Sequence, residues 1–501
     1  MRIILSKNLL ATLLVGISML TVASTAQAQS MDEALRLYKS KNYSDAAFAF
    51  YDVLQNDPNP DNRDKAEIYL AETLFKREIY VPALFYYTDI FKVGRTNRYY
   101  LNAVEGLLKI QEALHDWVLV PSLVNENLDP EGFVNLGPEE IARVNYMIGQ
   151  LSFTQGKNQD ARAFLEYVSP ESSFHAKARY LLGILEIRTG NPEQALPHFR
   201  AVLDIVPEDS PSQDLLEVRG LAQVAAGRTA YGLGRYAESA DYYAVVPRFS
   251  RHWFTAMYES AWSYYMQDEY GRALGELHSV TAPYFSKRHI PEAYVIQGTT
   301  YFINCQWDRV RRAVKTYKGT YEPMLANLKE YLSQDRNPTE IYRDVVSGGN
   351  GKFSVEIARE TRRSKRFRDY HFLLEHMKWE GREVLENPIW RGTRLAEDLS
   401  AIIEQHREDL EPVVGVWVKR QLVNRQAMLQ NFQSQVELLD FEVTDAEAEW
   451  LAQGREILKG RRRRLPRPDI PNDQWQHWNF DGEYWKGELG FFQHSIRSEC
   501  E

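Results

Sequence analysis

The sequence has little cysteine and no excess of positive charge. Its 501 residues include only two cysteines, Cys305 and Cys500, which excludes a disulfide-stapled scaffold and any zinc module built on four cysteines. Acidic residues outnumber basic residues by 69 to 60, which argues against a chain that binds nucleic acid along its length. After the first 28 residues there is no uncharged apolar run of about 18 residues, so we expect no later transmembrane helix.

Recognisable catalytic motifs are also missing. The sequence holds no G-x-S-x-G, H-E-x-x-H, Walker or Rossmann pattern. The glycine-rich loop before Lys352 resembles a phosphate loop, but it lacks the first glycine and the following Ser or Thr. His371, Glu375 and His376 have the wrong spacing for a zinc helix. We therefore predict a protein without catalytic, cofactor or metal residues, with an envelope hydrolase that uses paired carboxylates as the enzyme alternative.

The first 28 residues have the pattern of a secretory signal peptide. Arg2 and Lys7 precede an apolar run from Leu9 to Val22, and Ala26 and Ala28 form a small-x-small cleavage site. An uncleaved anchor is the alternative, but the apolar run is short for a membrane span. We expect cleavage after Ala28 and a periplasmic or exported protein. A lipoprotein is not expected, because lipidation needs a cysteine near the cleavage site and none is there.

Aromatic residues make up 12% of the chain and recur at regular intervals between about residues 30 and 320. Aromatic residues at positions 43, 80 and 117 lie 37 apart, and those at 236, 270 and 307 lie 34 and 37 apart. The clearest unit, Ala176–Pro207, has Gly183 in a first helix, Gly190 at a turn, Ala195 in a second helix, and then Phe199. This period predicts seven or eight stacked helix pairs.

The pattern resembles the tetratricopeptide repeat. The resemblance implies an all-α helix-pair solenoid over residues 29–323, whose first helices line a concave face that holds a peptide or a partner helix. Aromatic residues of the first helices also pack between repeats, and we favour this packing role for Tyr38, Phe75 and Phe302. The side chains that we assign to partner binding are Tyr146, Phe153, Tyr180, Arg188, Arg228, Tyr231, Tyr258, Trp262 and Tyr265.

Residues 324–460 form a second, helical region. Apolar residues recur at three- and four-residue steps from Leu395 to about Leu458, which predicts a long amphipathic segment. Pro412 and Gly415 suggest a break in it. The segment is either a coiled-coil hairpin or a cap that closes the solenoid, and both interpretations are open.

Residues 461–501 combine a basic, proline-containing linker with an aromatic tail. Arg461, Arg462, Arg463 and Arg464 suit either a solvated linker or contact with an anionic membrane surface. The tail either folds back onto the helices or docks a partner, and its docking candidates are Trp475, Trp478, Tyr484 and Trp485. With Gly482-Glu483, Trp485 and Glu488-Leu489-Gly490, the tail is similar to the ends of exported tetratricopeptide proteins of delta-proteobacteria, some of which belong to envelope-spanning gliding machinery.

The two cysteines lie far apart in sequence, at the last repeat turn and next to the end. An oxidising periplasm would permit a Cys305–Cys500 disulfide that staples the tail to the solenoid. Together these features predict a non-catalytic periplasmic interaction scaffold whose partners are other proteins of an envelope complex. A small-molecule carrier is a third class, which we disfavour because solenoid grooves are open.

Overall fold

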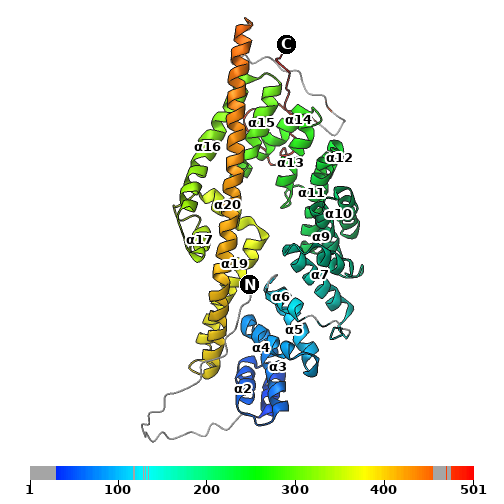
Figure 1. The fold of residues 1–501 in the computed structure, drawn as a ribbon, viewed down its shortest axis with the longest axis vertical. Helices are drawn as coiled ribbons and strands as arrows, with labels where there is room; N and C mark the ends of the chain where they lie inside the picture. The colour runs from blue at the N-terminus through cyan, green and yellow to red at the C-terminus, as the bar shows by residue number, and fades with distance from the viewer. Residues whose placement is uncertain are drawn as a thin grey trace.

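The computed structural model describes residues 30–454, except 117, 118, 128, 130 and 134, and also residues 470 and 476–500. The predicted signal peptide, the four consecutive arginines, Trp117 and Trp475 lie outside the described residues. Every regular element in the described part is a helix. The all-α helix-pair array predicted from the repeat spacing is therefore confirmed, and it ends in one long helix (Figure 1).

The first sixteen α-helices form eight consecutive pairs (Figure 1). The first four pairs are α1 Met31–Lys39 with α2 Tyr43–Asn56, α3 Pro60–Lys76 with α4 Tyr80–Val93, α5 Tyr100–Ala113 with α6 Leu119–Glu126, and α7 Pro138–Thr154 with α8 Asn158–Glu166. The next four are α9 His175–Arg188 with α10 Pro192–Ile205, α11 Gln213–Gly232 with α12 Tyr236–Ala244, α13 Trp253–Tyr265 with α14 Tyr270–Val280, and α15 Pro291–Ile303 with α16 Trp307–Ser333. Two short 3₁₀ helices, η1 Gly94–Thr96 and η2 Pro283–Phe285, lie in connections between pairs.

All eight pairs turn in the same way. Each turn contains one residue with positive φ, and these residues are Lys41, Glu78, His115, Gly156, Gly190, Gly234, Asp268 and Cys305. The N–H of the following residue donates to a carbonyl five positions earlier, as from Asn191 to Glu186 at 2.9 Å. This is the Schellman arrangement, which satisfies the last carbonyls of a helix. Glycine therefore marks only three of eight geometrically equivalent turns.

Small residues allow the two helices of a pair to approach closely. A Cβ atom added to Gly183 would lie 2.5 Å from the ring of Phe199, and one added to Gly227 would lie 2.6 Å from Tyr243. The ring of the second helix thus fills the space that the missing side chain leaves. Phe199 thus packs against Gly183 of its own helix pair, and the small residue and the ring together fill the space between the two helices.

The C-terminal region consists of α17 Pro338–Val346, α18 Val355–Arg363, α19 Lys365–Glu386 and α20 Arg394–Ala452. Helix α16 runs across the predicted boundary at residue 323, so the solenoid passes into this region within one helix. The domain boundaries themselves stay predictions.

The predicted break at Pro412 and Gly415 is wrong, and with it the coiled-coil hairpin, because α20 is one helix of 59 residues. Its buried face continues on both sides of the proline, through Leu410, Val414 and Val418. Gly415 lies where α17 approaches most closely, since an added Cβ would be 2.0 Å from the carbonyl oxygen of Pro338. Tertiary packing thus outweighs the hydrogen bond that proline removes.

The C-terminal helices return to the first repeats. The indole N–H of Trp390, which is fully buried, donates to the carbonyl of Ser44 at 2.8 Å. The ring of His376 on α19 stacks on Tyr80 with centroids 5.0 Å apart, and Tyr51 donates to Asp398 on α20. One hydrophobic core joins the first repeats to these helices. The chain therefore runs out along the solenoid, returns through α16 to α19 to the first repeats, and runs along α20 towards the last repeat again (Figure 1).

Candidate partner-binding site

A cleft of about 600 Å³ lies between the inner face of the solenoid and helices α19 and α20. One wall comes from the first helices of four successive pairs, α5, α7, α9 and α11, and the other comes from α19 and α20. This volume lies within the usual range for a ligand pocket. The concave face is therefore not an open groove over these repeats, because the chain's own helix α19 faces it.

Aromatic side chains from both walls line the cleft. Tyr146 on α7 and Tyr180 on α9 line one wall, and Tyr370 and Leu373 of α19 line the other. The ring of Tyr146 lies 5.5 Å from that of Phe174, centroid to centroid. Burial raises the pKa of Tyr146 and of Tyr180 above the ordinary value, so both phenols stay protonated. The cleft thus offers apolar ring faces together with hydroxyl groups.

Charged residues of both signs surround these rings. Arg143 pairs with Glu112 at 3.0 Å, and Lys177 pairs with Asp214. Both cations also lie over the ring of Phe174, at 5.4 and 5.1 Å from its centroid. Because the charges are paired, the cleft does not select a ligand of one strong charge.

Two buried polar atoms of residues that line the cleft have no hydrogen-bond partner within the described residues, and they are Nε of Arg143 and the side-chain oxygen of Gln150. The side-chain oxygen of Gln150 on α7 is buried and accepts no hydrogen bond there. Buried acceptors are almost always paired in native proteins. The Gln150 oxygen is therefore available to an N–H donor, such as the backbone of an extended peptide.

The other residues assigned to partner binding lie along the solenoid rather than in this cleft. Arg188 stacks on Phe153, 3.3 Å from the ring centroid, and donates to its carbonyl at 2.6 Å. Arg228 donates to Glu259 at 2.7 Å. These contacts link successive repeats, so their side chains already have partners within the chain.

The aromatic residues of the later repeats follow a recurring corner. Tyr231 contacts Tyr236, and Tyr265 contacts Tyr270, each pair joining the end of one helix to the start of the next. The same i, i+5 contact occurs in Tyr38–Tyr43, Phe75–Tyr80 and Phe302–Trp307. The packing role favoured for Tyr38, Phe75 and Phe302 therefore extends to Tyr231 and Tyr265.

Two more of the predicted residues also have partners within the chain. The indole N–H of Trp262 donates to Glu292 of the next pair at 3.0 Å, and Tyr258 packs against the core of α13 to α15. Of the nine predicted residues, the structure places Tyr146 and Tyr180 in the cleft. The sequence prediction missed Tyr370 and Leu373, because nothing in a charged helix indicates that it will lie opposite the solenoid.

The C-terminal tail lies across α13, α14 and α15. Leu489 is buried, with 1% of its surface exposed. The N–H of Gly490 donates to Ser279 at 2.8 Å, and that of His494 to the carbonyl of Gly271 at 2.9 Å. A Cβ added to Gly275 would lie 1.7 Å from the carbonyl oxygen of Phe492, so this glycine admits the tail backbone.

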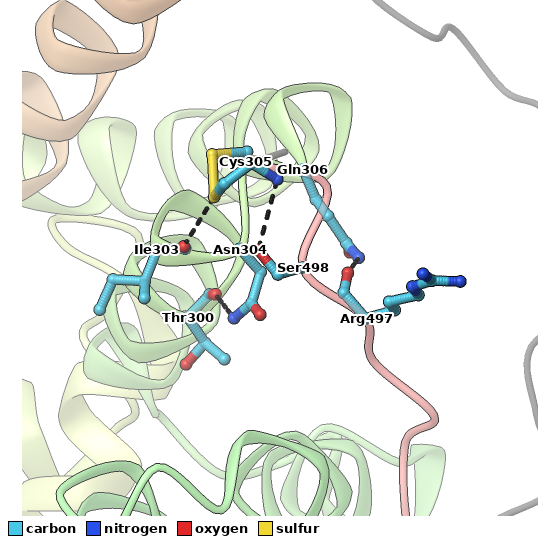
Figure 2. The surroundings of a disulfide bond; sticks show 8 residues. Thr300, Ile303, Asn304, Cys305, Gln306, Arg497 and Ser498 are labelled. Atoms are coloured by element: carbon cyan, nitrogen blue, oxygen red, sulfur yellow. Dashed lines mark hydrogen bonds between the residues drawn. A yellow bond between two sulfur atoms is a disulfide. The ribbon is translucent and has the colours of Figure 1, made fainter.

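The end of the tail reaches the last repeat turn (Figure 2). Glu499 donates its N–H to the carbonyl of Asn304 at 3.0 Å, and Gln306 donates to that of Arg497 at 2.9 Å. The structure joins Cys305 and Cys500 in a disulfide with Cα atoms 5.0 Å apart. Cys305 is the positive-φ residue of that turn, so the conformation that closes the eighth helix pair also presents the thiol.

Two of the predicted docking residues remain mostly exposed although the tail folds back. Trp478 and Trp485 are 76% and 64% exposed. Tyr484 instead stacks on His278, with ring centroids 5.2 Å apart. Folding back and docking a partner are therefore compatible roles for different residues of the tail.

Five carboxylates line the cleft, those of Glu112, Asp116, Asp214, Glu217 and Asp369, and each of them already binds a cation or backbone N–H groups within the chain. Burial raises the pKa of Glu276 to about 8 and that of Glu67 to about 7, yet neither carboxyl lines the cleft. In the described ranges no group of three His, Cys, Asp or Glu residues could hold a metal ion. No helix in the same ranges is both long and apolar enough to cross a membrane.

The comparisons with known proteins agree with the repeat pattern. Residues 140–210, which cover α7 to α10, match the model of the tetratricopeptide repeat, a family that is typically non-catalytic. Residues 140–210 are thus tetratricopeptide-like, and repeats of this kind generally serve protein–protein interaction. No curated protein matches the sequence.

Several solved structures are similar to it at low identity. A tetratricopeptide repeat protein from Parabacteroides merdae is 14% identical, with 58% of this chain and 91% of that chain covered and a TM-score of 0.26. The apo form of RapI is 12% identical, with coverage of 71% and 98% and a TM-score of 0.38. The TPR domain of P58(IPK) is 13% identical, with coverage of 75% and 98% and a TM-score of 0.17.

Proposed function

We propose that this chain is a non-catalytic scaffold of the bacterial periplasm that holds an extended segment of another protein between its solenoid and α19. The observation that carries the proposal is the cleft itself, which is lined by Tyr146, Tyr180 and Tyr370 together with Gln150, whose buried side-chain oxygen accepts no hydrogen bond within the described residues. A peptide supplies both apolar side chains and backbone N–H donors. Rigid aromatic residues are also common anchors of protein interfaces.

Export is the second part of the proposal. The signal-peptide pattern before Ala28 supports it, and so does the Cys305–Cys500 disulfide, because such bonds persist in oxidising compartments. We place the partner in an envelope-spanning complex, such as gliding, motility or secretion machinery, in line with the resemblance of the tail. An envelope hydrolase or assembly factor is the alternative, and the engagement of the cleft's carboxylates by cations and backbone N–H groups weighs against hydrolysis.

The test is site-specific photo-cross-linking in the native host. A photoreactive amino acid replaces Leu181, whose side chain lines the cleft, and the matched control replaces Tyr167, which is exposed at the end of α8. We expect a defined cross-linked protein at position 181 that is absent at position 167. The Tyr180→Ala variant should lose this cross-linked product while its melting temperature stays unchanged, which would locate the contact in the cleft. Equal cross-linking at both positions, or none at position 181, would contradict the proposal.

A further inference from the structure

Helix α20 has two apolar faces. The first is buried against α16, α17 and α19 and includes Val418, Leu422, Leu429 and Val436. The second lies on the opposite side of the helix, and we name it the outer stripe. Its large apolar members are Val413, Val416, Val423, Leu438 and Phe441, all exposed, from 46% at Val423 to 68% at Phe441.

The outer stripe has the spacing of a helix–helix seam. Together with Arg420, Ala427, Gln430 and Ser434, the apolar residues recur at steps of three or four from Val413 to Phe441, as in a coiled coil. At 1.5 Å per residue this stretch is about 42 Å long. Its large apolar residues form two exposed groups, Val413 to Val423 and Leu438 to Phe441, and exposed apolar groups that share one helix face mark an interaction surface.

The charges along the stripe identify the occupant. Arg420 lies in its first half, whereas Glu442 and Asp445 lie near its end, and all three are exposed. Within the described residues none of the three forms an ion pair. A second α20 in parallel would bring like charges together. An antiparallel second copy would bring each Arg420 to the acidic end of the other helix.

We propose that two copies of this chain associate through antiparallel outer stripes, with the two-fold axis passing between Gln430 and Asn431. In this register Val423 faces Leu438 of the second copy, and Arg420 lies beside Phe441, Glu442 and Asp445 of the second copy. Ala427 and Ser434 meet near the axis, where their small side chains allow the helices to approach. The interface is isologous, so every contact occurs twice.

The interface is independent of the cleft. The outer stripe lies on the side of α20 away from the buried face, and none of its apolar residues lines the cleft. Dimer formation and partner capture therefore fail or succeed separately.

Sedimentation equilibrium of the mature chain tests the proposal. We expect a concentration-dependent dimer that Leu438→Glu converts to a monomer with an unchanged helical signal and melting temperature, because the residue is exposed. The matched control Tyr167→Glu should leave the dimer intact. A chain that stays monomeric up to about 100 µM would overturn the proposal. If such a monomer binds anionic vesicles, the outer stripe is a membrane-contact surface instead.

Charge reversal tests the register. Arg420→Glu alone, or Glu442→Arg with Asp445→Arg, should weaken the dimer at least tenfold, and the triple variant should restore it. A photoreactive residue in place of Asn431 should cross-link two copies, whereas one in place of Tyr167 should not. A dimer that is insensitive to both charge variants and to the Leu438 variant would show that another surface associates.

Discussion

The carboxylate of Glu380 accepts the backbone N–H of Tyr80 at 2.8 Å, although 300 residues separate them in sequence. The same carboxylate accepts the N–H of Val81 at 3.1 Å. These two donors belong to the first turn of α4, whose own N-cap residue, Ile79, makes no side-chain hydrogen bond. A residue of α19 therefore caps a helix of the second repeat, which joins the end of the return path to the start of the solenoid.

Replacing this cap should be costly. Glu380 is fully buried, so Glu380→Ala leaves two N–H groups without an acceptor and should lower the free energy of unfolding by roughly 3 kcal/mol. The neighbouring Glu383→Ala is the control, since it removes a half-exposed ion pair with Arg77 and should cost about 1 kcal/mol or less. Urea denaturation compares the two variants. Equal effects would mean that the tertiary cap contributes no more than a surface pair.

The same contact should make stability depend on pH. Burial alone would lower the pKa of His376, but the hydrogen bond and charge of Glu380 outweigh it and raise the pKa above 6.5. The folded state therefore holds the proton more tightly, so this contribution is complete below pH 6.5 and is lost as pH rises through the folded pKa. Burial also raises the pKa of Glu380, which acts in the same direction, because the folded state again binds the proton more tightly.

Denaturation at pH 6 and pH 8.5 measures this dependence. The wild type should lose stability relative to His376→Gln over that interval. The double variant His376→Gln/Glu380→Gln should lack this component of the pH dependence. An advantage of the wild type that grows with pH would contradict the assigned direction of the His376 shift.

The same substitution should have opposite effects on stability at Gly190, which lies at a repeat turn, and at Gly319, which lies within a helix. Gly190 has φ of 85°, so Gly190→Ala should lower the free energy of unfolding by about 1–2 kcal/mol, the cost of the left-handed conformation for a residue with a Cβ. Gly319 lies within α16 with open space around it, so Gly319→Ala should raise it by about 0.5–1 kcal/mol. Calorimetry of both variants checks the signs, and destabilisation at Gly319 would contradict the helical assignment.

The disulfide should stabilise the oxidised protein. It closes a separation of 195 residues, and Cys500→Ser should lower the free energy of unfolding by about 2–4 kcal/mol through the larger entropy of the unfolded chain. Non-reducing peptide mapping should recover the linked peptides. Under a reducing agent the wild type and the variant should become equal in stability, and a difference that persists would assign the effect to the serine rather than to the bond.

Substitutions in the tail should differ in effect between a buried position and an exposed position. Leu489→Ala removes a buried side chain and should cost roughly 2–4 kcal/mol and expose the tail to limited proteolysis. Trp485→Ala, at an exposed position of the same tail, should change stability by less than about 0.5 kcal/mol. Equal proteolytic sensitivity of the two variants would show that Leu489 does not hold the tail in place.

The sequence by itself determined the repeating part of the molecule, because the relevant interactions are local. Gly156, Gly190 and Gly234 lie at turns, and Tyr43, Tyr236 and Trp307 begin second helices, since these features follow from hydrogen bonds and packing within one helix pair. The turns at Lys41, Glu78 and Asp268 use the same backbone without glycine, and only the repeat period could indicate them.

Tertiary structure decided where the long-range surfaces lie. No local pattern shows that α19 faces Tyr146 and Tyr180, or that Glu380 caps α4, because these contacts join segments hundreds of residues apart. Pro412 predicted a break by its local chemistry, yet packing on α17 keeps α20 continuous. The sequence determined which residues are apolar, and the return of the chain along its own solenoid decided which of them stay exposed to a partner.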